Sequence, residues 1–217
     1  MLSFTEENYL KALLKITIDN NVVEVGTNEL ALHLNVKAAT VTDMLRRLKE
    51  KKLINYQKYG KIGLNDNGRK IALEILRKHR LWETFLYQKL DFNWDEVHEI
   101  AEQLEHIKSA KLINKLDAFL DFPQFDPHGD PIPTEHGELK VTYKKTLSEV
   151  AVGDTCKLAA VKDNSASFLQ YVVKVGLGIS SIIKVAARQE FDAMMQIEVD
   201  GKTHHVSEKF AENIFVL

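Results

Sequence analysis

The sequence predicts a mainly α-helical protein that ends in a small β domain. Apolar residues recur at helical spacing as far as about residue 120. All four prolines fall within 122–137, which is typical of a linker. After residue 147 the chain changes to short β-like runs separated by glycine-containing turns. The 217 residues are 45% apolar and 28% charged, a composition that supports packed cores and excludes a disordered chain.

Three helices and a hairpin are expected first. A capping box of Ser3 and Glu6 begins the first helix. The second and third helices are separated by a three-residue break at 35–37, and the third carries one apolar face. Two β-like runs, 53–57 and 61–64, then predict a two-stranded hairpin.

Two long helices and the β domain complete the chain. Turn residues at 65–68 predict the start of a helix over 69–90, and a second helix is expected from about 95 to 120. Four strands should then close into a small barrel, with the runs at 155–161, 181–185, 194–199 and 213–216. We therefore expect three domains, with the boundaries 1–73, 74–140 and 141–217.

The composition also predicts the compartment. Cys156 is the single cysteine, so no internal disulfide can form, and a reducing cytoplasm is expected. No apolar run has the length of roughly 18 residues that a membrane span needs. The first residues lack the basic and apolar regions of a secretory signal. We expect a cytoplasmic protein that does not bind membranes.

The net charge of −2 hides a strong segregation. Residues 1–78 hold 14 Lys and Arg against 9 Asp and Glu, whereas residues 79–140 hold 6 against 13. The last segment, 141–217, is balanced at 9 against 9. A basic head followed by an acidic middle indicates a polyanion-binding domain joined to a cation-binding one.

The basic head has the element order of a winged helix-turn-helix, in which the second helix of the pair enters the major groove of DNA. Residues at the start of that helix would face base edges, and nearby cations would contact phosphates. The predicted base-facing residues are Lys37, Ala38, Ala39, Thr40, Thr42 and Asp43. The predicted phosphate contacts are Arg46, Arg47, Lys58 and Lys61. The alternative is a helical bundle with a solvated basic face.

Histidines and carboxylates recur at helical spacing in the acidic middle. His79 and Glu83 are four residues apart and share one helix face. A second face is expected to carry His98, Glu102, Glu105 and His106. Nitrogen and oxygen donors without a thiolate suit Mn²⁺ or Fe²⁺ better than a soft metal. The alternative for each residue is a solvated or packed side chain with no metal.

The same residues give little support to an enzyme. Residues 98–102 resemble the zinc-protease motif His-Glu-x-x-His, but Glu102 replaces the second histidine. A di-iron bundle needs two Glu-x-x-His pairs, and only Asp95 with His98 comes near one. We expect no catalysis. Two alternatives stay open: a DNA-binding regulator whose acidic stripe is structural, and a metal-dependent hydrolase that uses His98 and Glu102.

Six segments together resemble one family, the iron- and manganese-dependent transcriptional repressors of bacteria, which includes the diphtheria toxin repressor and the manganese transport regulator. Their order and spacing make the resemblance specific, and it covers almost the whole chain. The segments are Thr5–Leu10, Ala39–Thr42, Leu64–Gly68, Arg77–Glu83, Glu96–His106 and Pro127–Pro133. Residues after 147 are similar to the SH3-like barrel of the longer members.

The resemblance implies a homodimer in which a divalent metal favours DNA binding and so represses metal-uptake genes. Two-fold symmetry then predicts an inverted-repeat operator. One metal site matches His79, Glu83 and His98. A second site matches Glu102, Glu105 and His106, together with Asn8 from the first helix.

Glu102 stands where the iron-responsive branch typically has cysteine, so Mn²⁺ is the expected metal and Fe²⁺ the alternative. The manganese-responsive branch has acidic residues where this chain has Asn8 and Lys11. An ammonium cannot be a ligand. We also expect Glu102 and Glu105 to repel one another when no metal is bound.

Overall fold

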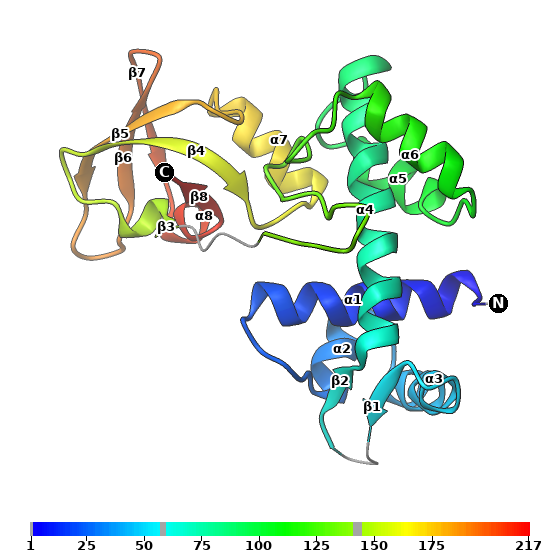
Figure 1. The fold of residues 1–217 in the computed structure, drawn as a ribbon. Helices are drawn as coiled ribbons and strands as arrows, with labels where there is room; N and C mark the ends of the chain where they lie inside the picture. Colours follow the sequence, from blue (N-terminus) through cyan, green and yellow to red (C-terminus); the bar gives the residue numbers. More distant parts are fainter. Residues whose placement is uncertain (1, 57–59, 141–144) are drawn as a thin grey trace. The chain divides into compact units, whose positions relative to one another are not determined.

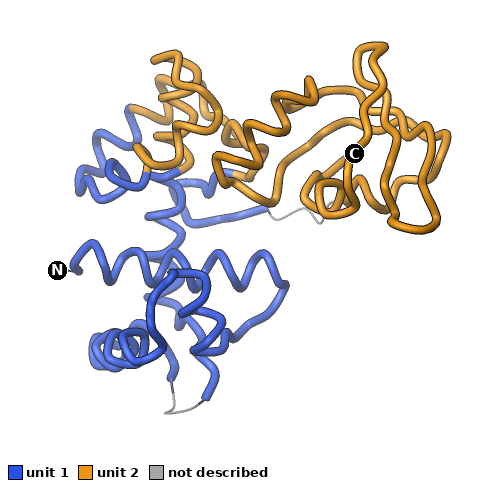
Figure 2. Tube along the Cα trace, turned by 180° about the vertical axis from the view of Figure 1, so that it is seen from behind, with its two compact units in different colours: residues 1–79, 102–115, 132–141 blue, residues 80–101, 116–131, 142–217 orange. Residues whose placement is uncertain are grey.

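The computed structural model describes residues 2–56, 60–140 and 145–217. Figure 1 gives the order of helices and strands, and Figure 2 shows that the chain divides into two compact units. The first unit holds residues 1–79, 102–115 and 132–141, and the second holds the remainder. Among the described residues, no helix combines the length and the hydropathy that crossing a membrane requires.

The first unit begins with the predicted winged helix-turn-helix. Its elements are α1 (Phe4–Asp19), α2 (Thr27–His33), α3 (Ala38–Glu50), β1 (Ile54–Tyr56) and β2 (Ile62–Leu64). Both hydrogen bonds of the expected capping box are present at the start of α1. The two strands pair antiparallel as the wing. Leucines from the three helices form the core of this unit, namely Leu10, Leu13, Leu14, Leu30, Leu45 and Leu48.

Helix α4 (Asp66–Lys89) begins three residues earlier than predicted. The Asn65 side chain accepts a hydrogen bond from the Gly68 N–H at 3.0 Å, so the turn residues cap the helix instead of preceding it. A Cβ on Gly68 would lie 1.9 Å from the Leu53 carbonyl oxygen. Glycine is therefore needed at this position because the helix passes directly against the backbone of Leu53, the residue before β1.

The single helix expected over 95–120 is wrong. The chain forms α5 (Val97–Leu104) and α6 (Ala110–Phe119), with a break at 105–109. The Ser109 Oγ accepts a hydrogen bond from the Leu112 N–H and starts a new helix. The break lets Glu105 and His106 turn inward, where both are buried. Helical spacing alone cannot reveal such a break, because both halves keep an apolar face.

The C-terminal β domain is a six-stranded antiparallel sheet with the strand order β3-β8-β4-β5-β6-β7. The strands are β3 (Lys145–Thr146), β4 (Thr155–Val161), β5 (Ile182–Arg188), β6 (Met195–Val199), β7 (Lys202–Val206) and β8 (Ile214–Val216). The prediction located four of these strands and missed two: the two-residue β3, and β7, whose Lys-Thr-His-His run is polar. A short 3₁₀ turn, η1 (Leu147–Glu149), follows β3.

Two helices within the β domain were also not predicted. Helix α7 (Ala166–Lys174) follows β4, and α8 (Glu208–Glu212) precedes β8. Leu169 of α7 and Phe210 of α8 belong to the buried core of the domain. The Phe, Tyr and Val residues of α7 favour strands locally, so packing on the sheet decides its helical state. Helix α8 has helix-favouring residues and a Ser207 cap, but its five residues are too few to show helical periodicity.

Candidate metal centre and DNA-binding surface

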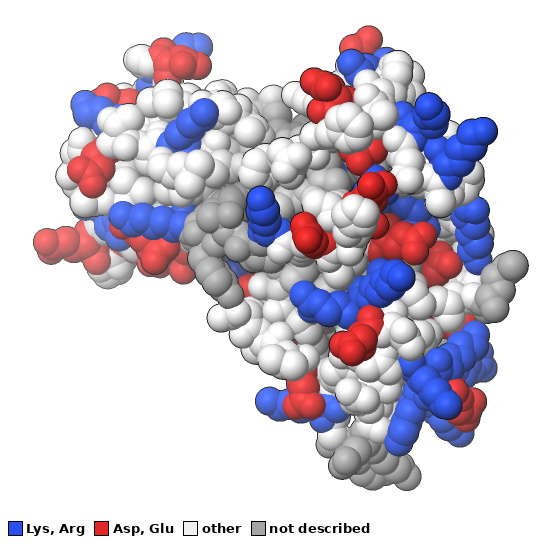
Figure 3. Space-filling view, viewed as in Figure 1, with Lys and Arg blue, Asp and Glu red and all other residues white. Residues whose placement is uncertain are grey.

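The predicted base-facing residues lie on the exposed side of α3. Lys37 is the N-cap residue of that helix, and its backbone is extended. Val41, Leu45 and Leu48 point into the core, which leaves the opposite side of the helix in solvent. The exposed residues are Lys37, Ala38, Ala39, Thr40, Thr42, Asp43, Arg46 and Arg47. Figure 3 shows Lys and Arg side chains gathered over this helix.

Two details modify this surface. Arg46 forms an exposed ion pair with Asp43 at 3.2 Å, so part of its charge is balanced within the helix. The Thr42 hydroxyl donates to the Ala38 carbonyl oxygen at 3.0 Å. Lys61 is exposed next to β2, whereas Lys58 lies outside the described residues.

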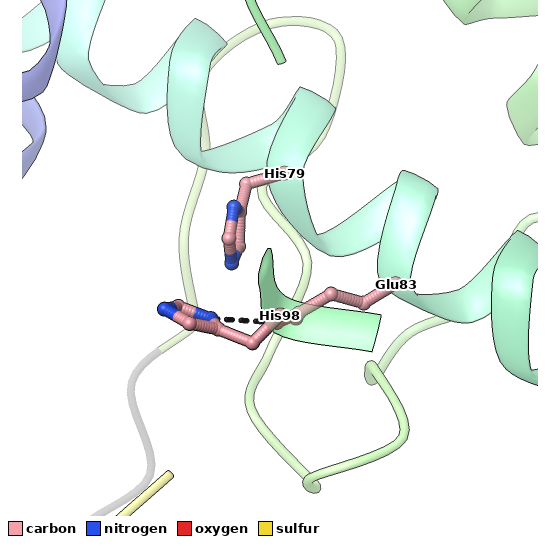
Figure 4. Close-up of side chains that lie close together, drawn as sticks. All are labelled: His79, Glu83 and His98. Atoms are coloured by element: carbon pink, nitrogen blue, oxygen red, sulfur yellow. Dashed lines mark hydrogen bonds and ion pairs between the residues drawn. The ribbon is translucent and has the colours of Figure 1, made fainter. Parts of the chain in front are cut away.

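His79, Glu83 and His98 form the first histidine–carboxylate cluster. His79 and Glu83 lie one turn apart on α4, and His98 on α5 points toward Glu83 (Figure 4). The His98 Nδ1 lies 3.1 Å from the Glu83 Oε1. One ligand atom from each of the three residues lies within 4.8 Å of the others. His79 and Glu83 are buried, and only His98 is partly accessible.

Glu102 and Glu105 form a second cluster with His79, again within 4.8 Å. The Glu105 Oε2 lies 2.7 Å from both the His79 Nδ1 and the Lys11 Nζ. Lys11 also contacts the Glu102 carboxylate. The expected repulsion between Glu102 and Glu105 is therefore wrong for this structure, because the Lys11 ammonium from α1 lies between the two carboxylates and balances them.

The remaining members of the predicted second site, His106 and Asn8, have different surroundings. The His106 Nδ1 lies 2.7 Å from the Glu7 Oε2, and its ring stacks on Phe4. Its Nε2 lies 3.9 Å from the Glu105 Oε1, so His106 borders the Glu102–Glu105 cluster. The Asn8 Oδ1 is buried and has no hydrogen-bond partner among the described residues. A buried carbonyl oxygen without a donor is costly, and a cation would satisfy it. Sequence reasoning missed Glu7, which neighbours the position it chose.

A third cluster was not predicted. Glu83, Asp126 and His128 are all buried, and their ligand atoms lie within 4.8 Å of one another. The His128 Nε2 is 3.1 Å from the Trp94 carbonyl oxygen, while its Nδ1 faces the Glu83 Oε2 at 3.8 Å. Burial, reinforced by Asp130 and Glu83, raises the pKa of Asp126 to about 7.

The local sequence explains how Asp126 and His128 reach this cluster. The Asp126 Oδ1 accepts hydrogen bonds from the N–H groups of His128 and Asp130, an Asx-type turn. Gly129 has φ +84°, and a Cβ there would lie 2.0 Å from the Ala159 carbonyl oxygen. The Asp-Pro-His-Gly-Asp order was the available signal for this cluster, and it was read as a linker.

The donor set is uniform across these clusters: imidazole nitrogens and carboxylate oxygens, without a thiolate. Such donors suit Mn²⁺ and Fe²⁺, and the buried Asn8 oxygen supplies a further hard donor. The fold and these clusters together define a class, the winged-helix DNA-binding proteins with a histidine- and carboxylate-rich helical domain and an SH3-like β domain.

Three family models match the chain. They describe the N-terminal DNA-binding domain of the iron-dependent repressors (residues 1–62), their metal-binding and dimerisation domain (65–134), and the FeoA domain (145–217). Among solved structures, a "Manganese-dependent transcriptional repressor complex with manganese" is 36% identical, covers 98% of this chain and 99% of that chain, and superposes with a TM-score of 0.87. The manganese regulator SloR is 30% identical over 98% of this chain and 97% of its own, with a TM-score of 0.78.

Curated relatives agree over the first two domains. The iron-dependent repressor IdeR of Mycobacterium tuberculosis is 30% identical over 59% of this chain, and the match spans 55% of that protein. A 44% identical match covers 32% of this chain but 16% of a "Probable metal transport system membrane protein" of Chlamydia trachomatis. The chain thus spans about half or less of the length of these relatives. It belongs to the iron- and manganese-dependent repressor family that includes the diphtheria toxin repressor. That family consists of DNA-binding repressors, so the hydrolase alternative is not favoured.

Proposed function

We propose that this protein is a homodimeric repressor that binds an inverted-repeat operator when Mn²⁺, or alternatively Fe²⁺, is bound, and so controls metal-uptake genes. It acts in the cytoplasm. One observation carries the proposal: α1 is part of the winged helix-turn-helix, and it also reaches the carboxylate and histidine clusters through Glu7 and Lys11. A cation at those clusters would therefore act directly on the DNA-binding head. We assign these roles to the domains 1–73, 74–140 and 141–217.

We assign metal binding to His79, Glu83, His98, Glu102, Glu105, His106 and Asn8. We add Asp126 and His128, because Glu83 belongs to their cluster as well as to the cluster with His79 and His98. A bound divalent ion would supply positive charge to these carboxylates. The protein's own part is to orient its donors: His79 is held by Glu105, His98 by Glu83, and His106 by Glu7. Hydrogen bonds of this kind fix the direction of each imidazole ring.

DNA binding with and without Mn²⁺ tests the proposal. We expect an operator selected by the protein from random DNA to bind tightly with Mn²⁺ and weakly after chelation. Equal binding in both conditions would favour the regulator with a structural acidic stripe. A lack of any preference for selected DNA would contradict DNA-binding function itself.

The cations of α3 and the wing should contact phosphates. Replacing Arg46, Arg47, Lys58 and Lys61 by glutamine should weaken binding to all DNA sequences alike. The slope of log affinity against log salt concentration should fall by roughly one unit for each true contact. Lys202→Gln, an exposed lysine of β7, is the control and should leave the slope unchanged. An unchanged slope in the fourfold variant would contradict this docking.

We assign the dimer contact to the apolar residues of the segment 95–120, together with the helix that precedes it. Burial limits which of these residues can take part. Ile113 and Leu116 are buried within the chain itself, whereas Leu112 is 42% exposed. Larger exposed apolar side chains lie at the ends of α4 and α6 in the second unit, namely Tyr87, Leu90, Phe119 and Phe122. An apolar surface of this kind indicates an interface with a second copy of the chain.

We therefore expect Phe119→Asp to produce a monomer. Phe119 is 63% exposed, so the loss of its contacts with Phe85 and Lys89 should cost little stability in the isolated chain. Sedimentation velocity at micromolar concentration with Mn²⁺ measures the change. Phe191→Asp, a fully exposed phenylalanine of the β domain, should remain dimeric. A dimeric Phe119→Asp protein would place the interface elsewhere.

A further inference from the structure

Trp94 connects the helical part of the second unit to the β domain. It lies in the segment between α4 and α5, but its side chain is only 8% exposed and belongs to the hydrophobic core of the β domain. Both regions are in the second compact unit (Figure 2). Beside Trp94, the Asp95 carboxylate accepts a hydrogen bond from the Gln170 side chain of α7 at 2.7 Å. The β domain is therefore packed against the residues that precede α5.

Trp94 also contacts the His128 imidazole in two ways. The two rings stack, with their centroids 5.7 Å apart and an angle of 16° between their planes. The His128 Nε2 lies 3.1 Å from the Trp94 carbonyl oxygen. Because a carbonyl oxygen can only accept, the proton lies on Nε2. The neutral ring then has its lone pair on Nδ1, which is the form that binds a metal.

The His128 Nδ1 is left without a hydrogen-bond partner inside the described ranges. Its side chain is fully buried, and the Glu83 Oε2 at 3.8 Å is beyond hydrogen-bond distance. A buried nitrogen of this kind is costly. A cation shared with Glu83 and Asp126 would satisfy it, so the ring is oriented toward a site for a ligand.

Strand β4 of the β domain fixes the backbone of the same residue. The His128 carbonyl oxygen accepts a hydrogen bond from the Val161 N–H at 3.1 Å. The next residue, Gly129, lies directly against the Ala159 carbonyl oxygen, with no room for a side chain between them. The ring of His128 is thus held by Trp94, and its backbone is held by β4.

We propose that the β domain is a structural part of the metal centre, and that Trp94 is the positioning residue that holds His128 toward Glu83. The inference rests on the proposed function, because it requires the metal-binding role assigned to His128. Trp94 supplies no ligand atom. Since its side chain is part of the β-domain core, a cation at this cluster and the packing of the β domain should stabilise one another.

Tryptophan fluorescence of the full chain tests this placement. Trp82→Phe leaves Trp94 as the only tryptophan, and it breaks no hydrogen bond, because the Trp82 Nε1 has no partner in the part of the chain that is described. Mn²⁺ has unpaired electrons and quenches a nearby indole, whereas Zn²⁺ does not. We expect Mn²⁺ to reduce the Trp94 emission far more than Zn²⁺ does, and we expect His128→Gln in the same background to remove the difference.

The electron paramagnetic resonance signal of free Mn²⁺ counts the ions that each variant binds. Trp94→Ala should bind one ion at least about tenfold more weakly than the wild type, the usual effect of losing a group that orients a metal ligand. Trp94→Phe keeps a stacking ring and should bind as the wild type does. Ile197→Ala is the control, because it removes a buried side chain of the same core from β6, which does not pair with β4. It should also bind as the wild type does.

Two results would overturn the inference but leave the other metal clusters of the proposed function in place. One is Mn²⁺ binding without any loss of Trp94 emission, and the other is wild-type Mn²⁺ binding by Trp94→Ala. If Trp94→Ala does not fold, the fluorescence titration, which leaves Trp94 unchanged, gives the answer. A wild-type chain that binds no Mn²⁺ would contradict the proposed function itself, and the inference with it.

Discussion

Glu105→Ala is expected to abolish the Mn²⁺ dependence of DNA binding. Glu105 is fully buried, and one of its oxygens meets both Lys11 of α1 and His79 of α4. It is therefore the carboxylate through which a bound cation would act on the DNA-binding head. A coupling of about 1–3 kcal/mol between metal and DNA corresponds to roughly 5–150-fold in affinity, and the variant should lose this factor.

Fluorescence anisotropy on the selected operator measures the loss, with Mn²⁺ and after chelation. The variant should keep a weak, salt-sensitive affinity for any DNA, because the cations of α3 are unchanged. Glu105→Gln preserves the shape of the side chain and separates metal loss from misfolding. Glu190→Ala, an exposed glutamate outside the clusters, should respond to Mn²⁺ as wild type. If DNA binding by both Glu105 variants still depended fully on Mn²⁺, the Glu102–Glu105 cluster would have only a structural role.

Lys11→Met should have the second largest effect. It should lower the stability of the metal-free protein. The ammonium is the counter-ion of Glu102 and Glu105, and its side chain is 12% exposed. Removing one partner of a buried ion pair costs about 3–5 kcal/mol. Because Glu102 is 34% exposed and therefore screened by solvent, we expect a smaller loss of roughly 1–3 kcal/mol in the free energy of unfolding.

Mn²⁺ should then bind more tightly to Lys11→Met than to the wild type, because no ammonium has to leave the carboxylates. Lys11→Glu should enlarge this gain, since it adds a third carboxylate for a hard cation. Thermal unfolding without metal and calorimetric titration with Mn²⁺ report the two effects separately. Lys15→Met changes the same charge one turn further along α1 and serves as the control. Wild-type stability and Mn²⁺ affinity in Lys11→Met would show that the ammonium does not compete with metal.

The local patterns were sufficient for the elements of the DNA-binding head. Each of its helices carries an apolar face, a cap or a break within its own sequence, and the hairpin is bounded by turn residues. The exposed side of α3 followed from the same periodicity, because Val41, Leu45 and Leu48 fix which residues remain in solvent. No partner outside the head was needed for these predictions.

In other segments the local patterns gave wrong or incomplete predictions, because tertiary packing determines the structure there. The helical periodicity of apolar residues continues across 105–109, although the helix is interrupted there and Glu105 and His106 are buried. Helix α7 was missed because its Phe, Tyr and Val residues favour strands until it packs on the sheet, and α8 was missed because five residues are too few to show helical periodicity. The linker reading of 122–137 was incomplete, since an Asx-type turn and Gly129 bring Asp126 and His128 into the buried cluster with Glu83.

The sequence by itself determined the order of the elements, the N- and O-donor chemistry of the acidic segment and the family. Only the tertiary structure decided which charges meet: Lys11 between Glu102 and Glu105, and Glu7 against His106. These contacts join residues more than 90 positions apart, at separations of 91, 94 and 99. Spacing along one helix predicts a shared face, but it carries no information about which side chain of another helix packs against that face.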